Sequence, residues 1–113
     1  MVDEVSFFAM GLWTVKKGNE EEFISSWQAF AKWTVDNQFG AIETYLTHDR
    51  SDPNLFVSFG SWTSDEALAR WRGTNEFKAF FAHGKELCTE VRPLTLDTVT
   101  RIGTNIPALV GRA

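Results

Sequence analysis

The side chains best suited to chemistry in this 113-residue chain are aromatic, and they gather between Ser61 and Phe81. In "SWTSDEALARWRGTNEFKAFF", two tryptophans precede three phenylalanines, and Arg72 directly follows the second tryptophan. Flat apolar rings beside a guanidinium could hold an aromatic molecule and orient its anionic or phenolic oxygen. The simpler interpretation is a hydrophobic core with an exposed arginine at a helix end. Both interpretations stay open at this point.

Five residues are candidates for lining a substrate pocket: Trp27, Trp71, Arg72, Phe77 and Phe81. Trp71 directly precedes the end of a helical pattern that is interrupted at Gly73. Trp13, Trp27 and Trp62 are expected mainly in the core or at an interface, with pocket contact as the alternative for each. Trp33 lies roughly 80° away from the apolar stripe of its helix. It could rim a pocket, touch a partner subunit or stay half-exposed.

The titratable side chains give no clear proton acceptor. His83 is the most tempting base, but it shares a helical face with Glu76 and Glu86, which favours a solvated surface position. His48 ends a strand beside a turn and is expected to be exposed. Tyr45, the only tyrosine, could donate a hydrogen bond or simply lie in the sheet. The spacing indicates neither a Ser-His-Asp set nor a carboxylate pair, so the catalytic residues stay unassigned.

Composition limits the class of protein. A net charge of −4 and a pI of about 5.1 argue against nucleic acid and anionic membranes as partners. Cys88 is the single cysteine, so no intrachain disulfide is possible and an inert buried thiol is expected. No metal-ligand spacing, glycine-rich phosphate loop, membrane-length apolar run or basic leader is present. We therefore expect a cytoplasmic protein without a metal or cofactor.

Capping residues, turn residues and hydrophobic patterns divide the chain into strands and helices. The expected segments are a strand over 5–15, a helix over 20–37, strands over 41–48 and 54–62, a helix interrupted at Gly73 and continuing over 76–90, and a strand over 91–102. The expected N-caps are Asn19, then Thr63 or Ser64, then Thr74 or Asn75. These segments form one domain over 1–103, followed by a C-terminal tail over 104–113.

The order β-α-β-β-α-β predicts an α+β, ferredoxin-like fold with a four-stranded antiparallel sheet. Its first and third strands are central and its second and fourth are edges, and Pro93 suits an edge. Both central strands are apolar at successive positions, which predicts that both faces of the sheet are dry. Two helices cover one face only. We therefore expect a second copy of the chain to cover the other face, in a symmetric homodimer.

Three stretches resemble the antibiotic-biosynthesis-monooxygenase family of the dimeric α/β-barrel superfamily. They are "WTVKKGNEEEF", "DRSDPNLFVSFGSW" and "WTSDEALARWRGTNEFKAFF", and the resemblance covers roughly 6–102. It implies a dimer whose two sheets form a barrel, with a pocket between sheet and helices in each subunit. Trp71 occupies a pocket-lining position in this family, which makes it the strongest of the five candidates. The family includes cofactor-independent oxygenases of polycyclic phenols and quinols, and haem-degrading enzymes.

The chain departs from the family at polar positions. Haem-degrading members use an asparagine, a tryptophan and a histidine where this chain has Gly11, Trp71 and Phe81. Many quinol-oxidising members carry a glutamate and a histidine where this chain has Gly60 and Trp71. The resemblance therefore implies a pocket that lacks the family's usual polar groups.

These observations lead to one principal hypothesis and two alternatives. The principal hypothesis is a homodimeric, cofactor-independent monooxygenase acting on a small aromatic or quinol-like substrate in a sheet-helix pocket. The first alternative is a non-catalytic dimer that binds a small aromatic ligand in the same pocket. The second is a haem-degrading enzyme, which the missing histidine disfavours.

Overall fold

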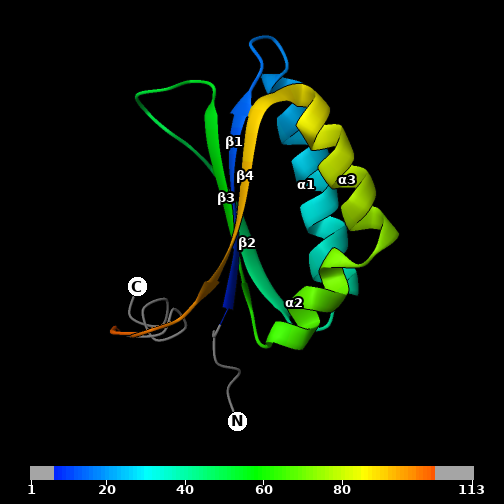
Figure 1. The fold of residues 1–113 in the computed structure, drawn as a ribbon, viewed down its shortest axis with the longest axis vertical. Helices are drawn as coiled ribbons and strands as arrows, with labels where there is room; N and C mark the ends of the chain where they lie inside the picture. Colours follow the sequence, from blue (N-terminus) through cyan, green and yellow to red (C-terminus); the bar gives the residue numbers. More distant parts are fainter. Residues whose placement is uncertain (1–6, 104–113) are drawn as a thin grey trace, which may run out of the picture.

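The computed structural model describes residues 7–103, which form one four-stranded antiparallel sheet and three helices (Figure 1). The elements are β1 (Phe7–Val15), α1 (Glu20–Asn37), β2 (Ala41–His48), β3 (Leu55–Trp62), α2 (Asp65–Arg72), α3 (Asn75–Leu87) and β4 (Cys88–Asp97). The strand order is β2-β3-β1-β4, so β1 and β3 are central, as predicted. The predicted α+β, ferredoxin-like fold is confirmed, with its second helix divided in two.

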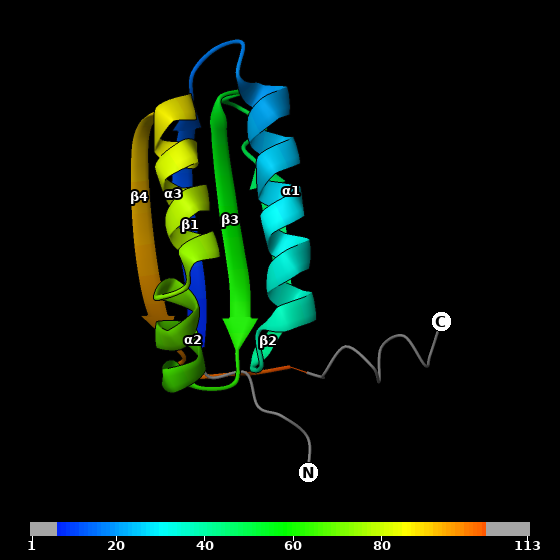
Figure 2. The same cartoon turned by 90° about the vertical axis from the view of Figure 1, so that its right-hand side faces the viewer.

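All three helices lie on one face of the sheet, which we call the inner face (Figure 1). Seen from the helical side, α1 follows the β2–β3 half of the sheet and α3 follows the β1–β4 half (Figure 2). The main core lies between these helices and the sheet. Its buried members are Trp13, Val15, Phe23, Phe56, Phe80, Leu87 and Cys88.

The strand register assigns each residue to a face. Trp13 pairs with Phe56 on β3 and Val91 on β4, and these residues lie on the inner face. The neighbouring pair of Leu12 and Val57 therefore points to the opposite, outer face, because side chains alternate along a strand. In β1 the odd-numbered residues therefore face the core and the even-numbered residues face outward, and in β3 the reverse holds.

The outer face is not covered by any helix within residues 7–103 (Figure 1). Its centre is apolar, and charged residues such as Glu43 and Arg92 lie on its edge strands. Register and alternation place on it Phe8, Met10, Leu12, Tyr45, Leu55, Val57, Phe59, Leu94 and Leu96. Tyr45 and Leu96 are 44% and 39% exposed, although both are large and apolar. The predicted tail over 104–113 and the predicted first strand residues 5–6 lie outside the described residues.

The start of α1 corrects one predicted contact. Asn19 is the N-cap residue, but its side chain makes no capping hydrogen bond. Instead, the backbone N–H of Gly18 donates to Glu20 Oε1 at 2.8 Å, and Asn54 Nδ2 donates to the other oxygen of Glu20 at 3.0 Å. Glu20 therefore ties the first turn of the helix to the preceding turn and to the loop before β3.

The predicted break at Gly73 is confirmed, and each half of the broken helix has its own cap. Ser64 Oγ accepts a hydrogen bond from the N–H of Ala67, and Thr74 Oγ1 accepts one from Phe77. These bonds satisfy backbone donors that have no partner inside the helix. The break follows Arg72, so Trp71 lies in the last turn of α2.

The predicted boundary between the last helix and last strand was wrong by three residues. The helix was expected to reach residue 90, but α3 ends at Leu87 and β4 begins at Cys88. Cys88 has an extended backbone, with φ −117° and ψ 153°, and it pairs with Val15. Apolar residues at 87 and 88 fit a helical stripe, but here both are buried across a helix-to-strand junction. None of the helices within 7–103 is long and apolar enough to cross a membrane.

Candidate functional site

A cavity lies between the inner face of the sheet and the helices, at the end of the sheet near α2. It exists because small residues replace large ones there. Ala9 pairs with Gly60, and Gly11 pairs with Ser58, at inward positions of the two central strands. At the other end of the same face, Trp13 fills the corresponding space. The small residues on β1 and β3 leave a hollow above this end of the sheet, although the Trp13 indole occupies the space directly over Gly11.

The roof and walls of the cavity are aromatic, and its volume is about 90 Å³. The five residues predicted for a substrate pocket, Trp27, Trp71, Arg72, Phe77 and Phe81, all line it. Phe30 joins the wall rings: it stacks on Phe80 at 4.6 Å between ring centroids and on Trp71 at 5.7 Å. The structure thus brings the predicted set together, while ligand binding by that set stays a prediction.

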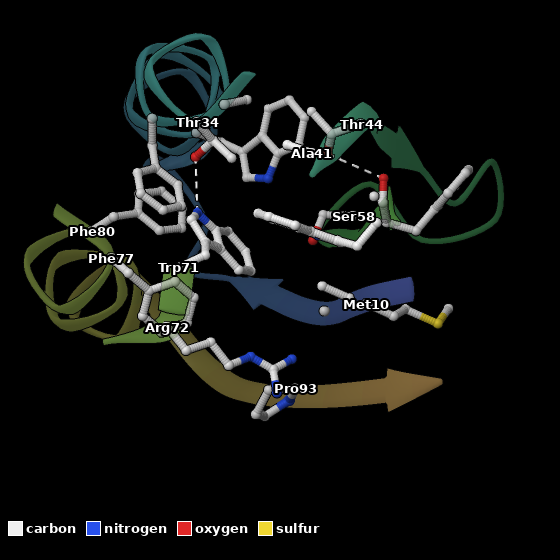
Figure 3. Close-up of a pocket in the computed structure, with 18 of the residues that line it drawn as sticks. Met10, Thr34, Ala41, Thr44, Ser58, Trp71, Arg72, Phe77, Phe80 and Pro93 are labelled. Carbon is white, nitrogen blue, oxygen red and sulfur yellow. Dashed lines mark hydrogen bonds between the residues drawn. The ribbon is translucent and has the colours of Figure 1, made fainter. Parts of the chain in front are cut away.

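Trp71 stands at the centre of this wall and is held on three sides. Its indole Nε1 donates to Thr34 Oγ1 at 3.0 Å (Figure 3). Its ring lies 4.9 Å from the ring of Trp62 and meets Phe77 edge-on at 4.7 Å. A half-buried tryptophan whose N–H has a partner keeps one orientation. Trp71 therefore presents a fixed flat surface to the cavity.

Trp13 closes the cavity toward the core, and two glycines make room for it. Its Nε1 donates to Ser58 Oγ at 3.0 Å. A Cβ on Gly11 would lie 2.5 Å from that nitrogen, and a Cβ on Gly84 of α3 would lie 2.9 Å from the ring. Both distances are shorter than real contacts, so glycine at these positions lets the indole reach the serine.

The polar groups of the cavity are mostly hydroxyls that already have partners. Thr34 and Ser58 accept from the two indoles, and Thr44 Oγ1 donates to the carbonyl of Phe59 at 3.2 Å. Within residues 7–103 the lining includes no histidine and no tyrosine, and Glu43 is its only acidic residue. Register places Glu43 on the outer face, opposite Ser61. The described lining therefore offers no evident proton acceptor.

Arg72 is the one basic residue among the described lining residues. It is half-buried at the end of α2 and extends along β4 beside Pro93 (Figure 3). Its Nη1 donates to Thr95 Oγ1. Burial lowers the pKa of the guanidinium, and the charge of Asp65 partly opposes this effect. The guanidinium is positively charged at neutral pH all the same, because its ordinary pKa is so high.

The other candidate residues lie elsewhere. His83 Nε2 is 3.0 Å from a carboxylate oxygen of Glu22 on α1, and the side chain is 43% exposed, so the predicted surface position is confirmed. His48 is exposed, and Tyr45 stacks on the outer-face residue Phe59. None of these three side chains belongs to the cavity wall within residues 7–103.

Trp33 and Cys88 also lie outside the cavity lining. Trp33 is half-buried and stacks on Phe30 at 6.0 Å. Cys88 is buried, and burial raises the pKa of its thiol to about 11. The predicted inert thiol is consistent with this environment. Residues 7–103 contain no group of three or more His, Cys, Asp or Glu side chains that could hold a metal ion.

Three further residues belong to the lining or support it, and none of them was among the five residues predicted for the pocket. Trp62 was expected mainly in the core and is indeed buried, yet it also borders the cavity. Thr34 fits the apolar stripe of α1 by its spacing, and the structure shows that its hydroxyl accepts the hydrogen bond of the Trp71 indole. Ser58 was not singled out. Its signal was a polar residue at an inward position, between Phe56 and Gly60 on β3.

Comparison with known proteins adds a family and a set of structures. The family model described as antibiotic biosynthesis monooxygenase matches residues 6–83. No curated protein matches the chain at a significant level. SnoaB from Streptomyces nogalater, described as a cofactor-independent oxygenase, superposes with a TM-score of 0.80 at 20% identity, over 89% of this chain and all of SnoaB.

Two further structures show the same architecture. Rv0793 from Mycobacterium tuberculosis has a TM-score of 0.77 at 17% identity, covering 87% of this chain and 99% of its own. A conserved protein from Methanosarcina mazei has a TM-score of 0.76 at 16% identity, covering 82% and 92%. At these identities the similarity establishes the fold, and the chemistry has to be argued from the cavity itself.

Proposed function

The chain belongs to the antibiotic biosynthesis monooxygenase family, and on that premise we propose that it is a cofactor-independent monooxygenase of a small phenolic or quinol-like substrate. The cavity carries this proposal. It presents stacked aromatic rings around a fixed Trp71, with a single cation at its side. Such a wall binds a flat ring by stacking and keeps bulk water away from a reactive intermediate.

The reaction class needs little from the protein beyond binding and orientation. A phenolate is electron-rich enough to reduce dioxygen directly. When a C–H carbon para to the hydroxyl becomes a quinone carbonyl, one oxygen atom enters the product. The other leaves as water together with the two hydrogens lost from the substrate. The substrate supplies all the electrons, so the protein contributes desolvation and positioning.

The size of the cavity favours a small substrate. A cavity of roughly 150 Å³ in another protein binds benzene, whereas this one measures about 90 Å³. One aromatic ring therefore enters with a modest outward movement of side chains at the mouth. A polycyclic substrate requires a much larger rearrangement of Trp71 and its neighbours. We propose a substrate with a single aromatic ring in the cavity.

The bare outer face supports a further part of the proposal, a homodimer in which two sheets pack face to face. Phe8, Leu12 and Val57 stand on this face in the centre of the sheet. An apolar layer of this kind is normally covered in soluble proteins. A second copy of the chain offers the same apolar surface, and a two-fold axis would bring the two together.

Oxygen uptake tests the proposed activity. Pure protein is mixed under air with single-ring phenols that carry hydrogen para to the hydroxyl, with 1-naphthol and with anthrone, which differ in the number of rings. We expect uptake above that of heat-denatured protein, fastest with single-ring substrates. With ¹⁸O₂, one labelled oxygen atom is expected in the quinone product and one in water. No uptake above the denatured control across the panel would contradict the proposal.

A specific observation favours the alternative, a binding protein without catalysis. The described lining contains no histidine or tyrosine, and its one carboxylate lies on the outer face. Quenching of tryptophan fluorescence and thermal stabilisation by the same compounds, without oxygen uptake, would support this alternative. Haem degradation finds less support, since Gly11 and Phe81 carry no ligating atom. A Soret shift on adding hemin would reopen it.

A further inference from the structure

The positive charge of Arg72 has no chemical role in the function proposed above. Its guanidinium borders an aromatic cavity, and the partner found for it is neutral, the hydroxyl of Thr95. Within residues 7–103 no carboxylate lies within 4.0 Å of it, whereas Lys32 and His83 do have such partners. Arg72 is therefore a half-buried cation without an anionic partner in the described part of the chain.

Such an arrangement is unfavourable for the empty protein. Removing a charge from water costs free energy unless an opposite charge compensates it. Burial of the guanidinium lowers the pKa of Arg72, as desolvation of a cation does. Asp65, on the same helix, is the one charge that acts appreciably on the guanidinium. On β4 the neighbours Pro93 and Thr95 are neutral.

A ligand with an anionic oxygen would compensate this charge. Guanidinium groups bind such oxygens through short, charge-assisted hydrogen bonds, which are stronger where water is scarce. Trp71 and Arg72 line the same cavity, so a ring stacked on Trp71 can turn its substituent toward the guanidinium. The same cavity lacks an evident proton acceptor. By stabilising the anion, Arg72 would favour ionisation of the phenol without a general base.

We infer that Arg72 binds the phenolic oxygen of a single-ring ligand and holds the ligand in its phenolate form. Bulk water then accepts the proton, and the phenolate becomes the electron-rich species that the oxidation requires. This inference rests on the proposed function for the location of the ligand. It assigns to the cavity a preference for anionic over neutral rings, which can be measured without turnover.

The probe is 4-nitrophenol, a single-ring phenol whose phenolate absorbs visible light. Absorbance is followed from pH 5 to pH 9 with and without excess protein, and affinity is measured by tryptophan quenching. We expect the wild-type protein to bind the phenolate at least about tenfold more tightly than the phenol, which lowers the pKa of the bound probe by about one unit. An unchanged or raised pKa of the bound probe would overturn the inference.

Variants separate charge from packing. Arg72→Gln is expected to abolish the phenolate preference, while Arg72→Lys keeps part of it because the positive charge stays. Arg70→Gln is the matched control: Arg70 lies on the same helix but is exposed and does not line the cavity. It should bind the probe as the wild type does. An Arg72→Gln protein that keeps its thermal melt and the full preference would contradict the assignment.

A parallel titration with 4-nitrobenzoate distinguishes a phenolate site from a carboxylate site. The inference predicts that 4-nitrophenolate binds more tightly than 4-nitrobenzoate, and the reverse order would replace it with a carboxylate site. Failure of the proposed function would look different. Binding of phenolate through Arg72 without oxygen uptake would leave this inference standing and remove the monooxygenase activity.

Discussion

Trp71 Nε1 donates a hydrogen bond to Thr34 Oγ1 at 3.0 Å, and this bond links α2 to α1 across the cavity. Thr34 is buried on the inner side of α1, where its neighbours along the stripe are apolar. The hydroxyl is thus the group that fixes the rotation of the indole. This relationship connects the stability of the helical layer to the shape of the candidate site.

Thr34→Val removes the acceptor and leaves the indole N–H without its partner. We expect a loss of about 1 kcal/mol in the free energy of unfolding, together with weaker quenching by aromatic ligands. Urea denaturation and fluorescence titration measure the two effects. Thr34→Ser keeps the hydroxyl and should behave nearly as the wild type. Equal stability of the valine and serine variants would show that the bond contributes little.

Gly84→Ala tests the contact between α3 and Trp13. The added Cβ would lie 2.9 Å from the indole ring, so we expect destabilisation by about 1–3 kcal/mol through overpacking. Gly73→Ala is the control, because its Cβ would meet its nearest atom at an ordinary 3.5 Å. Thermal melts of both variants decide the matter. A Gly84→Ala protein as stable as Gly73→Ala would contradict the packing described for Trp13.

Cys88 should react slowly and should affect stability only at high pH. Burial raises its thiol pKa from 9.0 to about 11, so at pH 8 alkylation is expected to be roughly a hundredfold slower than in urea, from the thiolate fraction alone. The folded pKa is raised, so the corresponding stability is fully present below pH 9 and is lost as the pH rises through 11. The rate of alkylation by iodoacetamide tests the reactivity, and thermal melts between pH 9 and pH 11 test the stability. Alkylation as fast in native buffer as in urea would contradict the buried thiol.

Val57→Lys should dissociate the proposed homodimer. Val57 lies in a central strand and points to the outer face, where a lysine would place an unpaired charge in the interface. Ile24→Lys is the control, since Ile24 is 40% exposed on α1, on the helical side of the sheet. Analytical ultracentrifugation should show a monomer for the first variant and a dimer for the second and the wild type. A monomeric wild type at micromolar concentration would end the dimer proposal.

Much of the fold was predictable because local signals agreed with one another. Ser64 and Thr74 are good caps, and both are observed as caps. Successive apolar residues in β1 and β3 correctly indicated central strands. The end of α3 was misplaced because Leu87 and Cys88 fit a helical stripe, whereas pairing of Cys88 with Val15 requires an extended chain. That pairing joins residues far apart in sequence and leaves no local signal.

The candidate site was predictable only in part. Aromatic residues on α1, α2 and α3 pointed to a pocket wall, and those residues do line the cavity. The sheet residues that form the floor of the cavity were not predicted. Small residues such as Ala9 and Gly60 indicate a hollow only when the strand register pairs them on one face. Arg72 could be named from its place beside Trp71, but the absence of an acidic partner within residues 7–103 required coordinates.

If oxidation of a small aromatic substrate takes place in this cavity, filling the cavity must stop it. Ala31→Leu adds bulk to the cavity wall on α1, and Ala29→Leu adds the same bulk at an exposed position of the same helix. The direct measurement is oxygen uptake by both variants and the wild type with the best substrate of the phenol panel. Uptake should fall at least about tenfold in Ala31→Leu and stay unchanged in Ala29→Leu. Equal uptake by all three folded proteins would show that the chemistry takes place elsewhere.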